Sequence, residues 1–202
     1  MLNDWFDRWE SVDIDARLKM LADGPITLPQ WFLTKFPDPY AWYQSRLQYT
    51  RTLASSSVLG VVMGLGDRHA GNFLLNTMNG GVVYIDFGIV FDHNFDGATE
   101  HIEAVPIRLT RNLVAALGPS GAGGFFAMAC AETLEHHVTM QRLLASDPVV
   151  APQSVPYTEA RLNTIMPLRN VSISMTMIDD IIAAATDPQS LAVMPSNWVP
   201  WF

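Results

Sequence analysis

The fold is decided by Gly64-Leu-Gly-Asp-Arg-His-Ala-Gly-Asn72 and by Val82-Val-Tyr-Ile-Asp-Phe-Gly88. Two short apolar runs, residues 73–76 and 82–85, flank the segment Thr77-Met-Asn-Gly-Gly81. This pattern predicts a β-hairpin, because Asn and Gly adopt the positive φ angles that tight hairpin turns require. Asn72 and Asp86 each lie seven residues from Asn79, so a symmetric hairpin would bring them side by side at its open end. An amide oxygen and a carboxylate held there form a hard oxygen site suited to Mg²⁺.

The polar residues around the hairpin have an informative spacing. Asp67 precedes Asn72 by five residues, and the triplet Asp86-Phe87-Gly88 follows. The catalytic-loop Asp and Asn of H-R-D-x-x-x-x-N kinases have the same separation, and D-F-G follows them too. The order here is Asp-Arg-His rather than His-Arg-Asp. In this respect the chain resembles the phosphatidylinositol 3-kinase-related protein kinases and their lipid-kinase cousins.

Two further stretches carry the resemblance. One is Val105-Pro-Ile-Arg-Leu-Thr-Arg111, which is similar to the V-P-F-R-L-T-R stretch that closes the activation loop in the protein-kinase branch, with Ile107 in place of the usual Phe. The other is the tail, Ala185-Thr-Asp-Pro188 to Asn197-Trp-Val-Pro-Trp-Phe202, which resembles the short FATC-type domain that ends these kinases. Its A-T-D-P and W-x-P-W segments are most similar to the branch that includes DNA-dependent protein kinase.

The resemblance implies an α+β fold that is mainly helical. It would be the C-terminal lobe of a phosphatidylinositol 3-kinase-like protein kinase, with a catalytic β-hairpin and a short helical tail domain. The expected divisions are the kinase C-lobe portion over residues 1–148, a linker over 149–175 and the FATC-type domain over 176–202. In the linker, prolines and mixed polar residues favour an extended segment.

The resemblance also implies roles for the polar residues. Asp67 would accept or orient the proton of the substrate hydroxyl, and His69 would donate a hydrogen bond to the transferring phosphoryl group. Asn72 and Asp86 would hold Mg²⁺ on the phosphates of ATP. The alternatives are a structural cap for Asp67 and a structural histidine for His69.

Three neighbouring residues would serve the site without reacting. Arg68 would stabilise the catalytic loop through a carboxylate partner. Phe87 would pack beneath the site, and Gly88 would let the chain enter an activation loop that runs from Asp86-Phe87-Gly88 to Pro106.

The implied function is a nuclear serine/threonine protein kinase of the DNA-damage response. Its substrates would be proteins with Ser or Thr followed by Gln. The tail resemblance implies repair of double-strand breaks by non-homologous end joining. The Ku heterodimer and DNA ends would then bind parts of the parent protein outside this segment, and no membrane would be involved.

Two other functions compete with this one. A lipid kinase needs Lys or Arg in its activation loop to hold an anionic head group. Residues 86–106 contain neither, but include Asp92, Asp96, Glu100 and Glu103. The second alternative is an inactive fragment or a pseudokinase-like interaction module. The intact Asp67, Asn72 and Asp86 argue against it, and the missing N-terminal lobe argues for it.

Composition limits the remaining possibilities. The 202 residues are 49% hydrophobic and carry a formal net charge of -8, which argues against a nucleic-acid surface within this segment. The single Cys130 excludes an internal disulfide and fits a reducing compartment; a small buried residue is expected there rather than a nucleophile. No apolar run reaches membrane-spanning length, and residues 1–4 lack the basic start of a signal peptide.

Hydrophobic periodicity predicts the helices. A weak helix is expected to about Leu21, and stronger ones over residues 40–63, 107–117 and 125–144. The apolar stripe of the last one would include Phe125, Met128 and Leu134. A short stripe from Ile178 to Ala185 predicts another helix, and the aromatic residues Trp198, Trp201 and Phe202 are expected to pack against the catalytic lobe near the activation loop.

An ATP site also needs a glycine-rich loop and a strand lysine from an N-terminal lobe. Only 66 residues precede Asp67, and the only lysines, Lys19 and Lys35, are not in a suitable context. We therefore expect a C-lobe with its tail, inactive as the isolated chain. It would be a fragment, an incomplete gene model or a degenerate copy.

Overall fold

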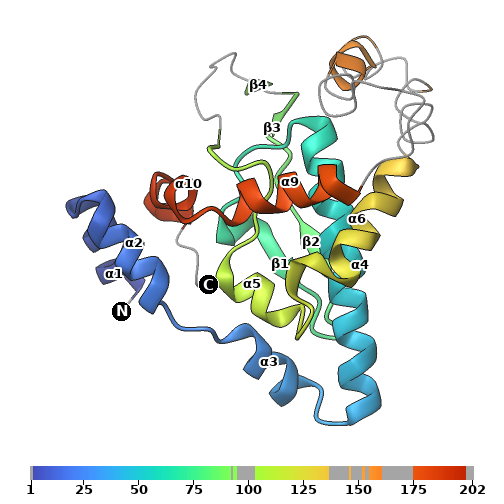
Figure 1. Cartoon of the computed structure of the whole chain (residues 1–202), viewed down its shortest axis with the longest axis horizontal. Coiled ribbons are helices and arrows are strands. Elements are labelled where there is room, and N and C mark those ends of the chain that lie inside the picture. Colours follow the sequence, from blue (N-terminus) through green and yellow to red (C-terminus); the bar gives the residue numbers. More distant parts are fainter. Residues whose placement is uncertain are drawn as a thin grey trace.

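The computed structural model describes residues 2–91, 93–94, 103–136, 146, 152, 155–160 and 175–198. Within these ranges the chain is mainly helical with a few short strands, as the sequence predicts (Figure 1). None of the helices described there is long and apolar enough to cross a membrane.

Three helices precede the centre of the fold: α1 (Leu2–Ser11), α2 (Ile14–Asp23) and α3 (Leu28–Lys35). The prediction of one helix to about Leu21 is wrong in one respect, because the first helix ends at Ser11 and Asp13 caps a second one. The Asp13 carboxylate accepts a hydrogen bond from the backbone N–H of Ala16 at 2.9 Å.

The long helix α4 (Pro39–Met63) crosses the molecule and confirms the helix predicted over residues 40–63 (Figure 1). Asp38 caps its first turn by accepting from the N–H of Ala41 at 2.9 Å. At the other end Gly64 has φ 60, the left-handed conformation that terminates helices and that glycine adopts without steric cost. The helix therefore stops immediately before the catalytic loop.

The predicted hairpin is present. A 3-10 turn, η1 (Ala70–Asn72), leads into β1 (Phe73–Leu75), which pairs antiparallel with β2 (Val82–Tyr84). The register differs from the symmetric one, because the backbone N–H of Ile85 donates to the carbonyl of Asn72 at 3.0 Å. Asn72 thus faces Ile85, and Asp86 lies one residue further along. A second short pair, β3 (Ile89–Val90) and β4 (His93–Asn94), follows.

The C-terminal half is helical: α5 (Arg111–Ala116), η2 (Gly121–Gly123), α6 (Phe125–Glu135), α9 (Met175–Thr186), α10 (Pro188–Ala192) and η3 (Ser196–Trp198). The predicted helix over 107–117 starts later than expected, at Arg111. Thr110 caps it, and the carbonyls of Val105 and Pro106 accept from Arg68 instead of from a following helical turn.

The helix predicted over 125–144 is described only to Glu135. Its buried stripe is Phe126, Ala127, Cys130 and Leu134, while Phe125 and Met128 are exposed. The prediction of a helix here is therefore confirmed, but the predicted buried face is right only for Leu134 and wrong for Phe125 and Met128. In the predicted linker, residues 155–160 are described, and they are helical.

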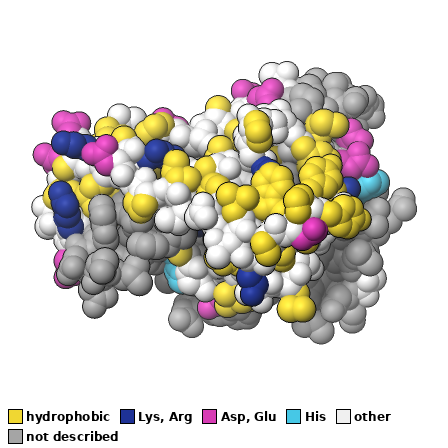
Figure 2. Space-filling model, turned by 90° about the horizontal axis from the view of Figure 1, so that it is seen from below, with side chains coloured by type: hydrophobic (Ala, Val, Ile, Leu, Met, Phe, Trp, Pro, Cys, Tyr) yellow, Lys and Arg dark blue, Asp and Glu magenta, His cyan; other side chains and the backbone are white. Residues whose placement is uncertain are grey.

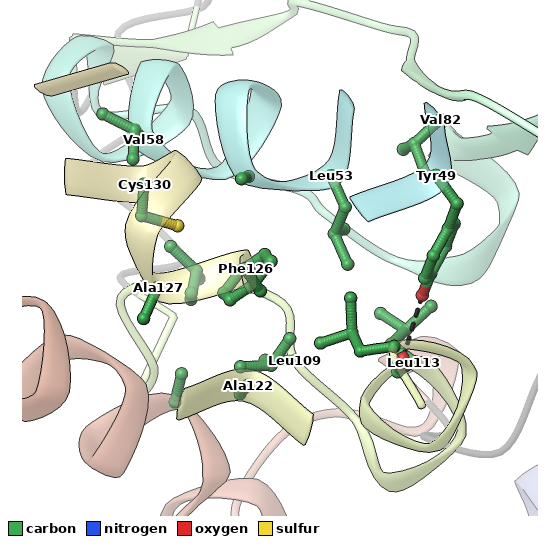
Figure 3. Close-up of a cluster of buried hydrophobic side chains, with 14 of the residues drawn as sticks. Tyr49, Leu53, Val58, Val82, Leu109, Leu113, Ala122, Phe126, Ala127 and Cys130 are labelled. Carbon is green, nitrogen blue, oxygen red and sulfur yellow. Dashed lines mark hydrogen bonds between the residues drawn. The ribbon is translucent and has the colours of Figure 1, made fainter. Parts of the chain in front are cut away.

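The main core lies where α4, the hairpin, α5 and α6 meet (Figure 3). Tyr49 and Leu53 of α4 are completely buried, and the Tyr49 hydroxyl donates to the carbonyl of Leu113 at 3.0 Å. Cys130 points into this core, and burial raises the pKa of its thiol to about 12, as expected for an inert residue. Helix α9 packs on α6, and its Ile178 and Ala185 are buried in this core.

A second, smaller core joins the two ends of the chain. It consists of buried side chains from α1, α2, residue 105 and the tail: Trp9, Met20, Leu21, Val105, Leu191, Ala192, Met194 and Trp198. The Trp9 indole N–H donates to the carbonyl of Met194 at 2.9 Å. The tail is thus packed between the N-terminal helices and the end of the activation loop.

Hydrophobic side chains also lie at the surface, and many gather on the face shown in Figure 2. Among exposed apolar residues, Leu33 lies on α3, and Tyr40 and Tyr43 lie on the first turns of α4. Tyr43 and Tyr49 are therefore two tyrosines of one helix in opposite environments.

We predict that Tyr49→Phe lowers the free energy of unfolding by about 1 kcal/mol at pH 7, because the Leu113 carbonyl loses its donor. Burial raises the pKa of Tyr49 well above 10.0, so only the unfolded chain ionises this group near that pH. Stability from the neutral phenol is complete below pH 10 and falls as the pH rises further. Denaturant unfolding from pH 7 to 11 should show a shallower alkaline loss for Tyr49→Phe than for wild type. Tyr43→Phe is the control, and an alkaline slope equally shallow in that variant would contradict the account.

Candidate active site

Asp67 lies on the loop that connects α4 to the hairpin, in a left-handed backbone conformation with φ 56. Asp tolerates this region better than most residues, at a cost of roughly 1 kcal/mol. The side-chain amide of Asn72 donates to the backbone carbonyl of Asp67 at 2.9 Å and more weakly to its Oδ2 at 3.4 Å. The η1 turn is capped by His69, not by Asp67, and the Asp67 side chain is 41% exposed. This geometry favours a reactive carboxylate over a structural cap.

His69 is oriented by its own turn. Its Nδ1 accepts a hydrogen bond from the backbone N–H of Gly71 at 3.0 Å. The neutral ring therefore carries its proton on Nε2, which lies 3.8 Å from Asp67 Oδ1. A Cβ at position 71 would come within 2.8 Å of the His69 ring, so glycine is needed for this approach. The arrangement leaves an N–H donor next to the Asp67 carboxylate.

Asn72 and Asp86 lie at the open end of the hairpin, as predicted, although they are not directly opposite each other. The Asn72 amide nitrogen is bound to Asp67, which leaves the amide oxygen available as a ligand. Asp86 is exposed, has φ 61, and accepts from the N–H of Gly88 at 3.0 Å through Oδ1. Oδ2 remains available.

No group of three or more His, Cys, Asp or Glu that could hold a metal is present in the described parts of the chain. Mg²⁺ does not need one, because it usually takes one or two protein oxygens together with phosphate oxygens and water. The donor set of Asn72 and Asp86 therefore fits Mg²⁺ carried on a nucleotide, and fits poorly a resident metal held by protein ligands alone.

One face of the hairpin is apolar and exposed. Leu74 and Val83, which pair across the strands, and Ile85 next to Asp86 are 45%, 49% and 39% exposed. Phe87 is 52% exposed, so the prediction that it packs beneath the site is wrong for this structure. The opposite face, with Val82 and Tyr84, is buried against the core.

Arg68 has the carboxylate partner that the sequence predicted, and the partner is Glu103. The backbone N–H of Arg68 donates to Glu103 Oε1 at 2.8 Å, and Nε donates to Oε2 at 2.6 Å. Nη2 completes an ion pair with the same carboxylate, and both side chains are 7% exposed. The guanidinium also donates to the carbonyls of Pro106 and Val105. The catalytic loop is thereby fixed to the end of the activation loop.

The tail and a second arginine complete this cluster. The indole N–H of Trp198 donates to Glu103 Oε1 at 2.8 Å, and the Arg108 guanidinium lies 4.8 Å from the centre of a Trp198 ring. Arg108 also donates to the carbonyl of Arg68 at 3.1 Å. Burial lowers the pKa of Arg108 to about 10, so it stays charged at neutral pH. The predicted packing of the tail near the activation loop is confirmed for Trp198; Trp201 and Phe202 lie outside the described residues.

A groove of about 550 Å³ opens beside Asp67. Its walls come from the N-terminal helices, the end of the activation loop and the tail: Glu10, Arg17, Asp67, Glu103, Ala104, Val193, Met194, Pro195, Ser196 and Trp198. Sequence reasoning missed Glu103 and Arg108 as functional positions. Glu103 was one acidic residue among four, and its only local signal is its place two residues before the V-P-I-R-L-T-R stretch.

Comparisons with known proteins show the family to which the chain belongs. Residues 3–146 match the family model described as phosphatidylinositol 3- and 4-kinase. The chain belongs to this family. Protein kinase rad3 of Schizosaccharomyces pombe is 33% identical over an alignment 207 residues long. The alignment covers 91% of this chain and 9% of that protein. Serine/threonine-protein kinase ATR of Arabidopsis thaliana is 32% identical over 213 residues, which cover 92% and 8%.

The fold is shared with solved members of the family. The structure of the FAT and kinase domain of CtTel1 superposes with a TM-score of 0.75 at 30% sequence identity, over 100% of this chain and 16% of that one. The chain thus spans a small part of the proteins it matches, and it has the mainly helical architecture of their kinase domain.

We predict that Arg68→Met destabilises the protein by about 3–5 kcal/mol, because it leaves the buried Glu103 carboxylate without its cation. Arg51→Met, at an exposed position of α4, is the control. It loses a cation–π contact 5.7 Å from the centre of the Phe125 ring and should change stability by no more than about 1 kcal/mol. Urea unfolding at pH 7 measures both. Equal stability of Arg68→Met and Arg51→Met would show that the ion pair does not hold the loop.

Proposed function

We propose that this segment supplies catalytic residues of a serine/threonine protein kinase that transfers the γ-phosphate of ATP to a protein hydroxyl. The observation that carries the proposal is the grouping of Asp67, His69, Asn72 and Asp86 around the open end of one hairpin. Family membership and the protein-kinase names of the relatives support the same activity.

In this proposal Asn72 Oδ1 and Asp86 Oδ2 would hold Mg²⁺ on the nucleotide phosphates. Bound there, the metal would neutralise charge on the phosphoryl group that is transferred. The bonds from the Asn72 amide to Asp67 and from Gly88 to Asp86 keep these two oxygens oriented before the nucleotide arrives.

Asp67 has the position and exposure to accept the proton of the attacking hydroxyl, or to orient that hydroxyl. His69 has a proton on Nε2 and can donate it in a hydrogen bond to an anionic oxygen of the transferring group. The two side chains are 3.8 Å apart, so they can act on the same reacting centre.

The exposed apolar face of the hairpin fits the rest of the nucleotide. Leu74, Val83 and Ile85 form a flat apolar surface next to Asp86. An adenine ring covering this surface would remove apolar area from water, which stabilises binding. ATP therefore matches the site at both its polar and its apolar end.

Two observations favour a protein over a lipid substrate. Residues 86–106 contain no Lys or Arg that could hold an inositol phosphate. The negative charge of Glu103 does not add to this first observation, because its carboxylate is bound by Arg68 and Trp198. The second observation is that relatives of this chain are named as serine/threonine-protein kinases.

The biological role is proposed at two levels. At the broader level we propose a nuclear kinase of the DNA-damage response that phosphorylates Ser or Thr before Gln. The protein-kinase names of the relatives support the kinase activity, and the rest follows from the family resemblance of the sequence. Membership of the branch of the DNA-dependent protein kinase catalytic subunit, with Ku and end joining, rests on the tail sequence alone and stays a prediction.

The assignment of roles predicts different kinetic defects for two variants of the full-length natural polypeptide. Asp86→Asn should weaken Mg²⁺-dependent ATP binding and abolish turnover, because it removes a charged metal ligand. Asp67→Ala should keep the KM for ATP and reduce kcat by roughly 10²–10⁴-fold, the usual contribution of a general acid or base. Asp180→Asn, exposed on α9, is the control.

The assay compares transfer from radiolabelled ATP to a Ser-Gln peptide and to vesicles that contain phosphatidylinositol. Peptide phosphorylation by wild type supports the proposal. Phosphorylation of the lipid alone would replace it with a lipid kinase. No transfer to either substrate, with normal folding, would leave the interaction module as the better description. Equal loss of ATP affinity in both variants would overturn the division of roles.

A further inference from the structure

Glu103 receives hydrogen bonds from two distant parts of the chain. Arg68 approaches through its backbone N–H at 2.8 Å and its Nε at 2.6 Å, and Trp198 approaches through its indole N–H at 2.8 Å. Arg68 lies in the catalytic loop and Trp198 in the C-terminal tail. All three side chains are buried. A single carboxylate therefore connects the tail to the loop that carries Asp67.

The contacts hold the backbone of the loop as well as the side chain. Glu103 accepts a hydrogen bond from the N–H of Arg68, which is part of the peptide group between Asp67 and Arg68. Arg108 donates a hydrogen bond to the carbonyl of Arg68, which is part of the peptide group between Arg68 and His69. Each of the two peptide groups between Asp67 and His69 is thus held by a hydrogen bond from a buried side chain. Asp67 has φ 56 between these constraints, a conformation that an unsupported loop would rarely hold.

We propose that Glu103 is a positioning residue for phosphoryl transfer, which orients Asp67 through Arg68 and depends on Trp198 for its own orientation. In this proposal Glu103 acts through Arg68 and not directly on the reacting groups. Its two oxygens are divided between the donors: Oε1 accepts from the Arg68 backbone and from Trp198, and Oε2 accepts from the Arg68 guanidinium. The inference rests on the proposed kinase function.

The distinguishing variant is Glu103→Gln. It keeps an oxygen that can accept from the Arg68 backbone and from Trp198, but it turns an amide N–H₂ toward the Arg68 guanidinium, where donor meets donor. We expect kcat to fall roughly 10²-fold, the effect of displacing a catalytic group by about 1 Å, while the KM for ATP stays unchanged. A merely structural role would lower the amount of folded enzyme and leave kcat per active site unaltered.

A second variant tests the dependence on the tail. Trp198→Phe removes the indole donor and keeps an aromatic ring against Arg108. It should lower kcat less than Glu103→Gln. The double variant should be no slower than Glu103→Gln alone, because Trp198 acts through Glu103. Additive losses would contradict this order of action. Glu135→Gln, exposed on α6, is the matched control for removing one carboxylate charge.

A spectroscopic measurement on residues 1–202 checks the contact without any kinase assay. In a ¹⁵N-labelled chain, Glu103→Gln should shift the indole N–H resonance of Trp198 and the amide resonance of Arg68. The indole resonance of Trp9, bound to the Met194 carbonyl, is the internal reference. Unchanged Trp198 and Arg68 resonances would overturn the proposal.

Failure of the proposed function and failure of the positioning role would give different results. Wild-type polypeptide without phosphotransfer activity overturns the proposed function and with it this role for Glu103. Active wild type with normal kcat in Glu103→Gln overturns the positioning role alone. If Glu103→Gln does not fold, the milder Trp198→Phe decides: normal kcat per active site in that variant removes the tail from the mechanism.

Discussion

The buried contact between Arg68 and Glu103 is the interaction on which the rest of the site depends. A charged pair with 7% exposure on each side is stable only if its remaining donors and acceptors are satisfied. Arg68 uses its other hydrogen bonds on the carbonyls of Val105 and Pro106, and Glu103 uses its second oxygen on the Arg68 backbone and on Trp198. The catalytic loop, the end of the activation loop and the tail are therefore parts of one hydrogen-bonded cluster.

This cluster explains why the C-terminal helices belong to the catalytic unit. Helix α9 packs on α6 in the main core, and α10 packs on α2 in the second core. Trp198 lies in the second core and also contacts the loop cluster through Glu103. Displacing the tail would uncover apolar area and leave Glu103 with one donor fewer. Both effects would act on the loop that carries Asp67, without any contact between the tail and a reacting atom.

Local sequence signals predicted much of the framework. Helix α4 follows from its apolar spacing, and the hairpin follows from Asn79-Gly80-Gly81. Two predictions failed, the first for a tertiary reason and the second for a local one. Residues 107–110 have an apolar spacing compatible with a helix, but the Val105 and Pro106 carbonyls are bound by Arg68. The hairpin register differs by one residue because the turn is closed by Asn76 and Gly81.

The candidate site was predictable to the extent that its chemistry is local. Asp67, Asn72 and Asp86 have a recognisable spacing. Glu103 is 35 residues from Arg68, and its only local signal, its place two residues before the V-P-I-R-L-T-R stretch, does not reveal its partner. Its importance comes from folding, which removes it from water and brings two donors to it. Arg108 is similar, since only the structure reveals that its guanidinium reaches the Arg68 carbonyl.

Hydrogen exchange of the Arg68 amide tests the account most directly. In residues 1–202 this N–H is bound to a buried carboxylate, so we predict slow exchange. Ending the chain at Ala192 removes Trp198 and should accelerate exchange at Arg68, while the Ile85 amide of the hairpin, bound to the Asn72 carbonyl, keeps its protection. An Arg68 amide that exchanges like an unprotected peptide in the intact chain, or that is unaffected by the shortened tail, would contradict the central claim.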